Sequence, residues 1–283
     1  MPTVRSVTAI EERFPRPSVM GVVNVTPDSF SDGGVHFDPT VAIAAARRMV
    51  AEGAALVDVG GESTRPGSDG VSVDEELRRV VPVLEGLAAA DVPVSIDTAK
   101  AEVARRAIEL GAELVNDVSA LRADPDLAGV VADAGAYLCL MHMQGEPRTM
   151  QLDPRYDDVA SEVAAFLEER LAFAVSQGIA EERICLDPGI GFGKTAQQNF
   201  ELVRRLDVLL ALGRPVLIGF SRKSSLGRVT GDLDAKTGPL SASVAAAVSA
   251  YERGASILRV HDVREHVEAL AVSRAITNEP SRP

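Results

Sequence analysis

The stretch Leu217-Ile218-Gly219-Phe220-Ser221-Arg222-Lys223-Ser224-Ser225-Leu226-Gly227 turns from an apolar run into a cationic turn and then into the expected start of a helix. Residues 216–220 have the continuous apolar character of a strand that is buried on both faces. The two serines at 221 and 224 suit the capping position of the following helix. Its N-terminus would direct free N–H groups at an anion, with Arg222 and Lys223 alongside. The stretch predicts a phosphate site at the end of a buried strand.

A solvated basic turn would also explain this stretch alone, but seven other strand-like runs end in the same kind of polar loop. They span residues 19–25, 55–60, 92–97, 113–117, 136–142, 183–189 and 255–261. Helical spacing is found over 39–52, 75–89, 101–110, 126–134, 159–177, 236–253 and 263–276. Gly53, Gly111, Gly135 and Gly254 each close such a segment, as glycine does just after a helix. Eight strand and helix units of about 30 residues predict an α/β protein built as a single (β/α)8 TIM barrel.

The length of 283 residues fits one barrel domain. We expect a polar N-terminal lead-in over 1–17, the barrel over 18–277 and a C-terminal tail over 278–283. A net charge of -12 argues against a general nucleic-acid or membrane-surface binder, so a local cationic cluster must hold any anionic substrate. With no signal-peptide core and no apolar run of membrane-spanning length, a cytoplasmic protein is expected. Cys139 and Cys185 lie in apolar runs and are expected to be reduced core thiols.

Polar side chains stand where the strand-like runs end. In a parallel barrel the carboxyl ends of all strands meet on one face, so residues far apart in the sequence converge there. These ends carry Asn24, Glu62, Asp97, Asn116, His142, Asp187, Lys223, Arg259 and His261. A hydrogen bond to a loop would explain any one of them. Burying them all would cost several kcal/mol without a ligand or mutual pairing, so together they predict a binding site.

The cluster divides into two groups by chemistry. Asp97, Asn116 and Asp187 suit a flat heterocycle with N–H edges, such as an aminopyrimidinone, which a carboxylate can bind through two parallel hydrogen bonds. The second group suits an anion with many oxygens and consists of Asn24, Arg65, Ser221, Arg259 and His261. The side-chain oxygen of Asn24 would also suit the Mg²⁺ that commonly accompanies a diphosphate.

Two further features have a less direct interpretation. His142 has no partner at metal-ligand spacing, so we expect it to be a strand-end or packing histidine. The run Asp187–Lys194 resembles a phosphate-binding loop only in part, because it lacks the full spacer before its Gly-Lys pair. We expect its glycines to let the backbone approach a ligand, with Phe192 as an aromatic wall.

Seven motifs, in order along nearly the whole chain, resemble those of the dihydropteroate synthase family. They are Asn24–Gly34, Asp58–Gly67, Ser95–Thr98, Asn116–Val118, Asp187–Gly189, Ser221–Ser224 and Arg259–Asp262. The resemblance implies a transferase of folate synthesis. It would condense 6-hydroxymethyl-7,8-dihydropterin diphosphate with 4-aminobenzoate to give 7,8-dihydropteroate and diphosphate.

The resemblance also implies a role for each site residue. Asp97, Asn116, Asp187 and Lys223 would bind the pterin, and Arg259 would stack on it. The diphosphate would be bound by Asn24 with Mg²⁺, Arg65, Ser221, Arg259 and His261. The 4-aminobenzoate pocket would consist of Thr64, Pro66, Phe192 and Ser224. The residues expected to take part in catalysis are Asp97, Lys223, Arg259 and His261.

The family's reaction is dissociative, so the resemblance implies that diphosphate leaves first and that the amine then traps a pterin methylene cation. This agrees with the residues themselves, because no activated nucleophile is evident and carboxylates lie where a cation would develop. The resemblance implies Mg²⁺ dependence, and a homodimer formed through outer helices is expected.

Two departures from the family pattern concern the aminobenzoate side. Ser225 stands where members usually carry a bulky apolar residue. The run 234–240 differs from the sequence common in the family, which contains an arginine and a Gly-Thr pair before the helix of the eighth unit. Sulfonamides, the family's inhibitors, extend past the volume of 4-aminobenzoate, so a site can reject them by shape. We therefore advance the hypothesis that this protein has reduced sulfonamide sensitivity.

Three alternatives stay open from the sequence. A pterin-dependent methyltransferase of the same barrel superfamily would share the pterin carboxylates but would have no use for the anion group. An aldolase forming a Schiff base at Lys223 would need a desolvated lysine, whereas Arg222 and an anion site flank this one. A barrel that binds its ligands without turnover is the non-enzymatic alternative.

Overall fold

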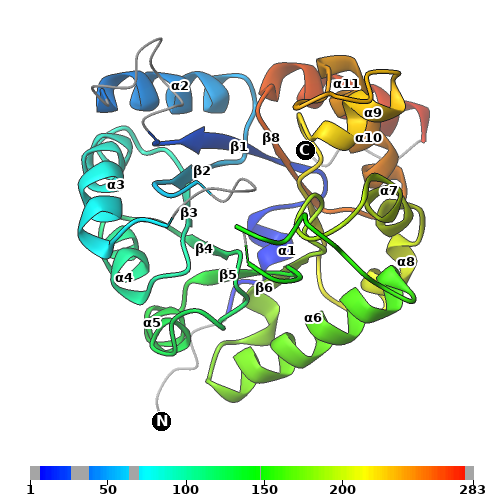
Figure 1. Cartoon of the computed structure of the whole chain (residues 1–283). Helices are drawn as coiled ribbons and strands as arrows, with labels where there is room; N and C mark the ends of the chain where they lie inside the picture. The colour runs from blue at the N-terminus through cyan, green and yellow to red at the C-terminus, as the bar shows by residue number, and fades with distance from the viewer. Residues whose placement is uncertain (1–6, 27–37, 64–69, 147, 278–283) are drawn as a thin grey trace.

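The computed structural model describes residues 7–26, 38–63, 70–146 and 148–277, and Figure 1 shows a ring of strands surrounded by helices. Eight parallel strands lie in the described part: β1 (Ser18–Asn24), β2 (Leu56–Gly60), β3 (Val94–Asp97), β4 (Leu114–Asp117), β5 (Tyr137–Met141), β6 (Ile184–Asp187), β7 (Leu217–Ile218) and β8 (Ile257–Val260). Their order is β6-β5-β4-β3-β2-β1-β8-β7. Between β6 and β7 the ring is joined by a bridge from Leu186 to Val216. The predicted (β/α)8 TIM barrel is confirmed.

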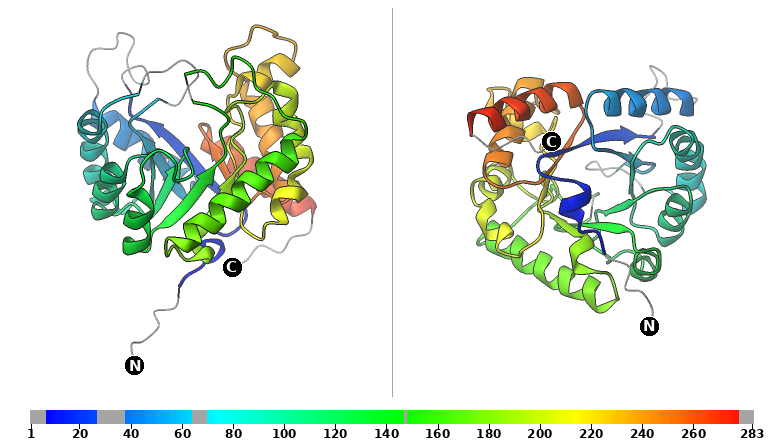
Figure 2. Two further views of the ribbon diagram at one scale, coloured as in Figure 1. Left: turned by 60° about the horizontal axis from the view of Figure 1, so that its bottom comes forward. Right: turned by 180° about the vertical axis from the view of Figure 1, so that it is seen from behind.

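The helices that follow the strands cover the outside of the ring (Figure 2). They are α2 (Pro39–Ala51), α3 (Val73–Ala88), α4 (Ala101–Glu109), α5 (Leu127–Ala134), α6 (Val159–Ser176), α7 (Ala196–Arg204), α8 (Leu206–Leu210), α9 (Ser224–Val229), α10 (Leu240–Glu252) and α11 (Val263–Ile276), with a 3-10 turn at η2 (Glu181–Arg183). The seven helical segments expected from periodicity are present, although α10 begins at Leu240 and not at Lys236. The glycines expected after four of them have φ of 104°, 99°, 61° and 112° at Gly53, Gly111, Gly135 and Gly254, as a left-handed position requires.

The segment before β1 closes the amino end of the barrel. It forms α1 (Ile10–Arg13), which crosses the ring in the view from behind in Figure 2. Ile10 is 0% exposed and Phe14 1% exposed, and both pack on the barrel residues Met20 and Leu114. The guanidinium of Arg13 donates two hydrogen bonds of 2.7 Å to the Glu113 carboxylate. The expectation of a merely polar lead-in is wrong for its described residues, because two large apolar side chains complete the core.

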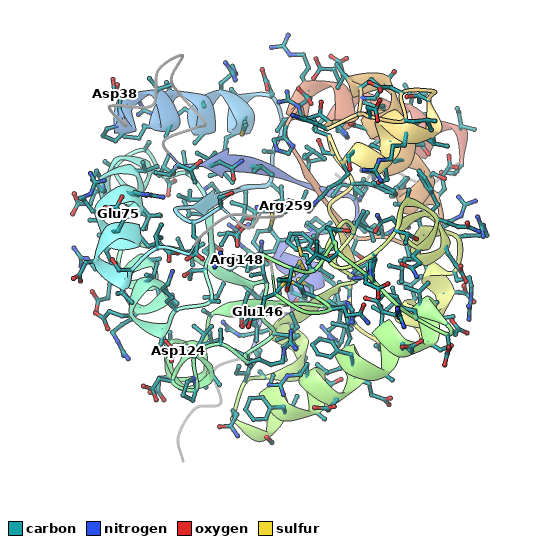
Figure 3. The ribbon with its side chains drawn as sticks, viewed as in Figure 1. Asp38, Glu75, Asp124, Glu146, Arg148 and Arg259 are labelled. Atoms are coloured by element: carbon teal, nitrogen blue, oxygen red, sulfur yellow. The ribbon has the colours of Figure 1, made fainter. Side chains whose placement is uncertain are left out.

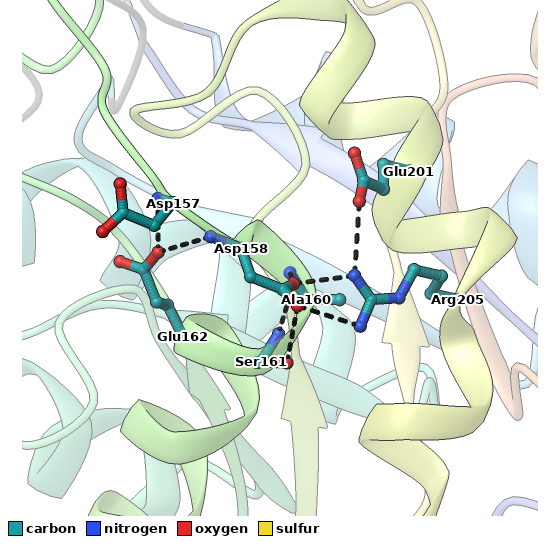
Figure 4. Close-up of polar contacts among 7 residues, drawn as sticks. All are labelled: Asp157, Asp158, Ala160, Ser161, Glu162, Glu201 and Arg205. Atoms are coloured by element: carbon teal, nitrogen blue, oxygen red, sulfur yellow. Dashed lines mark hydrogen bonds and ion pairs between the residues drawn. The ribbon is translucent and has the colours of Figure 1, made fainter.

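The start of α6 is fixed to the neighbouring helix pair (Figure 4). The Asp158 carboxylate accepts hydrogen bonds of 3.1 Å from the backbone N–H groups of residues 160 and 161. Arg205, between α7 and α8, donates to Asp158 Oδ1 at 2.7 Å and to Glu201 at 3.3 Å. One carboxylate therefore caps a helix and holds it to the next unit of the barrel.

The interior of the ring is apolar toward its amino end. Cys139 and Cys185 are free, buried and opposite each other in the β5–β6 register, which places both thiols in the core as predicted. Within the described ranges, no helix has both the length and the apolar character needed to cross a membrane.

Candidate active site

A small cavity lies at the carboxyl ends of the strands. Its lining contains all the residues expected to bind the heterocycle: Asp97 from β3, Asn116 from β4, Asp187 from β6, Lys223, and Arg259 from β8. Phe192 and the apolar side chains of Val118, Met141 and Ile190 complete the wall. Figure 3 shows Arg259 near the middle of the ring. The fold thus gathers residues that are up to 162 positions apart in the sequence.

Arg259 connects two carboxylates from the neighbouring strands β2 and β3. Its Nε donates to Asp58 Oδ2 at 2.6 Å and its Nη2 donates to Asp97 Oδ2 at 2.8 Å. Burial alone would lower the pKa of Arg259, but the charges of Asp58 and Asp97 outweigh it and raise that pKa, so the guanidinium stays charged. Burial raises the pKa of Asp97 above its usual range, against the opposing charge of Arg259. A ligand that binds Asp97 must therefore displace Arg259 from it or share the carboxylate with it.

Asp58 is a site residue that sequence reasoning missed. It is 0% exposed in the middle of β2, and its Oδ2 also accepts a 2.9 Å hydrogen bond from Asn116 Nδ2. Because a carboxylate only accepts, this bond fixes the Asn116 amide with its nitrogen toward Asp58. The Oδ1 of Asn116 is then a buried acceptor with no partner among the described residues, and an N–H group of a ligand would satisfy it. The overlooked signal was a carboxylate inside an otherwise apolar strand.

The loop after β6 is folded tightly against the protein. Asp187 Oδ1 accepts a 2.7 Å hydrogen bond from the N–H of Gly189. Burial raises the pKa of Asp187, while this hydrogen bond and the charge of Lys223 oppose the change. A Cβ added at Gly189 would lie 1.9 Å from the carbonyl oxygen of His142. The space beside Gly189 is therefore filled by the backbone that follows β5, and the expectation that the glycines of this run let a ligand approach stays a prediction.

Phe192 does form an aromatic wall. The Nζ of Lys223 lies 4.4 Å from the centre of its ring, within the range of a cation–π contact. This contact places the aromatic residue expected on the aminobenzoate side directly beside a residue expected on the pterin side.

The anion group is described in part. Ser221 Oγ lies 3.2 Å from the backbone nitrogen and 3.2 Å from Nδ1 of His261, so these two predicted residues do meet. Burial, together with the positive charges of Arg259 and Arg222, lowers the pKa of His261 to about 3. Asn24 is the last residue of β1, opposite Gly60 of β2. Asn24, Ser221, Ser224 and His261 are not among the residues that line the cavity, and Thr64, Arg65 and Pro66 lie outside the described residues.

Comparison with known proteins places the chain in a family. Residues 20–261 match the family model for pterin binding enzymes. Dihydropteroate synthase of Escherichia coli K12 is 48% identical over 263 residues, which are 92% of this chain and 91% of that protein. The chain belongs to the dihydropteroate synthase family of pterin-binding enzymes. The family resemblance drawn from the seven motifs is confirmed.

Solved structures of the dihydropteroate synthase family have the same fold. The Xanthomonas albilineans enzyme with 4-aminobenzoic acid has a TM-score of 0.86 at 49% identity and covers 94% of this chain and 95% of its own. The Yersinia pestis enzyme in a sulfonamide drug complex has a TM-score of 0.86 at 45% identity, with 93% and 95% covered. The X. albilineans enzyme in complex with 7,8-dihydropteroate has a TM-score of 0.83 at 46% identity, with 94% and 96% covered.

Within this family fold, the opening stretch differs locally from the expectation. β7 spans Leu217–Ile218 only. α9 begins at Ser224 with Lys223 at its N-cap and no side-chain cap, so the expected serine caps are wrong. Arg222 has a φ of 57°, and its Nε donates to Asp262 at 3.0 Å. An arginine expected beside the anion is therefore paired with a carboxylate from the loop after β8.

The described residues contain no group of three or more His, Cys, Asp or Glu side chains that could hold a metal ion. Asn24 offers one amide oxygen at a strand end, a hard ligand of the kind that Mg²⁺ prefers. This fits an ion held mainly by water and substrate oxygens and does not fit an all-protein cage.

His142 is a packing histidine, as expected. It follows β5, its backbone N–H donates to the carbonyl of Asp187 at 2.9 Å, and its ring meets that of Phe166 edge-on at 4.8 Å. Burial lowers the pKa of His142 to about 2, and the charges of Lys194 and Arg122 act in the same direction. The imidazole is therefore neutral.

Proposed function

We propose that this protein condenses 6-hydroxymethyl-7,8-dihydropterin diphosphate with 4-aminobenzoate, giving 7,8-dihydropteroate and diphosphate. The observation that carries the proposal is the cavity lined by Asp97, Asn116, Asp187 and Lys223 in a chain of the dihydropteroate synthase family. The X. albilineans relatives solved with 4-aminobenzoic acid and with 7,8-dihydropteroate support these ligands.

The pterin ring would bind by its N–H edge. The unpartnered Asn116 Oδ1 and the carboxylates of Asp97 and Asp187 supply acceptors on neighbouring strand ends. A bond to Asp97 would release the Nη2 of Arg259 that now contacts it, which frees the guanidinium to stack on the ring. Lys223, against Phe192, would donate to a ring acceptor.

The reaction proceeds through loss of the leaving group. The C–O bond to diphosphate breaks first, and the carboxylates of Asp58, Asp97 and Asp187 stabilise the positive charge that develops on the pterin methylene. The aniline nitrogen then forms the C–N bond and loses a proton. Ser221, His261 and Arg65 would hold the departing diphosphate, together with Asn24. Mg²⁺, when bound at Asn24, would neutralise part of its charge.

The aminobenzoate would lie between Phe192 and the start of α9, where Ser224 is the first helical residue. Thr64 and Pro66 would complete this pocket from the loop after β2. Ser225 is 4% exposed one position further along α9. The differing run 234–240 packs on the same helix, because a Cβ added at Gly227 would lie 2.3 Å from Cβ of Ala235. We keep reduced sulfonamide sensitivity as a proposal that rests on this local repacking.

A synthesis assay tests the function. The protein is incubated with the pterin diphosphate, 4-aminobenzoate and Mg²⁺, and formation of 7,8-dihydropteroate is followed by chromatography. We expect product with the wild type and loss of product with excess chelator. In a separate calorimetric measurement, Asp97→Asn should weaken pterin binding by about 1.5–3 kcal/mol, because a charged acceptor is lost. Absence of product would contradict the proposal. Borohydride trapping of a carbonyl compound at Lys223 would instead indicate an aldolase.

The expected homodimer also remains a proposal. α10 and α11 carry apolar side chains on the outer surface, with Leu240 40% and Val272 60% exposed beside Val244 and Ala269. A second copy packing on these helices would bury them. Light scattering gives the mass in solution, and a monomeric mass at micromolar concentration would contradict the proposal.

A further inference from the structure

Lys194 is a buried lysine that the mechanism above does not use. It lies near the end of the loop between β6 and α7 and is 2% exposed. Its Nζ lies 2.9 Å from Nδ1 of His142, 3.1 Å from the carbonyl oxygen of Gly189 and 2.9 Å from that of Phe192. Through these contacts, Lys194 links the residue that follows β5 to both ends of the turn over residues 189–192.

The contacts of Lys194 suit an ammonium group. An ammonium has three protons to donate, and three acceptors lie within 3.1 Å of it, with the carbonyl oxygen of His142 further away at 3.5 Å. His142 is neutral and accepts at Nδ1 when its proton is on Nε2. No ion pair joins Lys194 to a carboxylate among the residues that the structure describes. Burial lowers the pKa of Lys194 to about 7, although the charge of Asp187 raises it. Burying an ammonium without an ion pair costs free energy of desolvation. The hydrogen bonds of Lys194 are therefore expected to have a role that offsets this cost.

The turn held by Lys194 sets the position of Phe192. The N–H of Phe192 donates to the carbonyl of Gly189 at 3.0 Å, so both ends of the turn are bonded to each other and to Nζ. The N–H of Gly191 donates to Asn199 Oδ1 at 2.8 Å. The ring of Phe192 then reaches Lys223 at 4.4 Å. One buried side chain thus fixes the backbone that carries the aromatic wall of the cavity.

We propose that Lys194 is a positioning residue for the second substrate: by binding the carbonyls of Gly189 and Phe192 it holds the Phe192 ring where 4-aminobenzoate packs. This inference rests on the proposed function for its substrate, while the ordering of the turn stands on the contacts alone. Lys194 itself lies behind the cavity wall and is not among the residues that line it.

The test replaces Lys194 by methionine, which keeps the length and apolar stem and removes the donors. Tyr156→Phe is the matched control, because the Tyr156 hydroxyl donates to the next carbonyl of the same loop, that of Gly193, at 2.9 Å. Hydrogen exchange of the ligand-free protein reports the order of residues 188–194. Steady-state kinetics report the KM for the aminobenzoate substrate and calorimetry reports pterin binding.

In Lys194→Met we expect exchange of the turn amides to be about tenfold faster and the KM for the aminobenzoate substrate to be about tenfold higher. Pterin affinity should change by less than about threefold. Tm should fall only slightly, because removal of a buried charge offsets part of the cost of leaving its acceptors without a donor. Tyr156→Phe should change neither readout by more than about twofold. If Lys194→Met does not fold, Lys194→Gln, which keeps an amide donor, should give an intermediate loss.

Unchanged exchange in the variant overturns the inference whatever the enzyme does. A loss of pterin binding, aminobenzoate binding and Tm in equal measure also overturns it, because that pattern indicates general destabilisation. If the wild type forms no dihydropteroate while exchange still responds to Lys194, then the proposed function has failed and the role of Lys194 in ordering the turn is retained.

Discussion

Asp58 contacts two residues of the proposed pterin site without itself lining the cavity. It accepts hydrogen bonds from both Arg259 and Asn116. In Asp58→Asn the amide cannot serve both donors with the strength of a carboxylate, so Asn116 and Arg259 lose their fixed orientations. We expect pterin affinity to fall about tenfold by calorimetry.

Ser95→Ala is the control for Asp58. Ser95 is 0% exposed and opposite Asp58 in the β2–β3 register, and its hydroxyl has no partner within the described part of the chain. Its loss should leave pterin affinity within about twofold. If Asp58→Asn behaves like this control, the orientation of Asn116 does not depend on Asp58.

The proposed reduction in sulfonamide sensitivity depends on Ser225. Because it is 4% exposed, a phenylalanine would overpack the site, and methionine is the bulky apolar residue that adapts best to the space. We expect Ser225→Met to lower the ratio of the sulfonamide inhibition constant to the aminobenzoate KM by about fivefold. Val229→Met, at a position 64% exposed on the same helix, should leave the ratio unchanged. If this ratio is low in the wild type and the same in Ser225→Met and Val229→Met, then Ser225 has no part in discriminating sulfonamides from 4-aminobenzoate.

At the scale of elements, the sequence predicted what depends on local chemistry and missed what depends on distant partners. The glycines that end α2, α4, α5 and α10 were predictable, because a left-handed residue is needed wherever the chain leaves a helix. The turn before α9 was not. Arg222 adopts a φ of 57° while its side chain pairs with Asp262, 40 positions away, and Lys223 takes the N-cap in an extended conformation. No local pattern encodes that pairing.

Dependence on distant partners also explains why the roles of Asp58 and of the segment before β1 were not predicted. Strand-end carboxylates such as Asp97 and Asp187 were predictable because a parallel barrel collects strand ends on one face. Asp58 lies two positions before the end of β2 and is part of the site because it accepts hydrogen bonds from Arg259 and Asn116. Ile10 and Phe14 are spaced by one helical turn, a signal too short to separate a buried plug from a solvated tail.

α1 should matter for stability and not for catalysis. Phe14 directly follows the last residue of α1, is 1% exposed, and meets the ring of Tyr137 edge-on at 5.7 Å. We expect Phe14→Ala to lower the free energy of unfolding by about 3–5 kcal/mol, measured by urea denaturation. The KM values at a temperature where the variant is folded should equal those of the wild type. A change in KM without a loss of stability would contradict the separation of the two ends.

On the scale of the whole molecule, the barrel places groups that resist protonation at its carboxyl end. His142 and His261 are both neutral in the native state, with pKa values lowered to about 2 and about 3. In the unfolded chain a histidine has a pKa of about 6.5. Between these values the unfolded chain binds protons that the native protein does not, so acid favours unfolding.

The free energy of unfolding should therefore be greatest above about pH 6.5 and should fall as the pH drops through the range below it. His142, 6% exposed, contributes a loss of about 1.4 kcal/mol for each pH unit in that range, because its native state stays unprotonated down to about 2. Urea denaturation at a series of pH values from about 7 to about 5 measures the slope. His142→Gln keeps an acceptor for Lys194. In this variant the unfolded chain takes up about one proton fewer, so the slope should be shallower by about 1.4 kcal/mol for each pH unit, while the contribution of His261 is retained. An equal slope in the variant would mean that His142 takes up its proton in the native protein, and that the packing of its ring against Phe166 does not exclude the charged form.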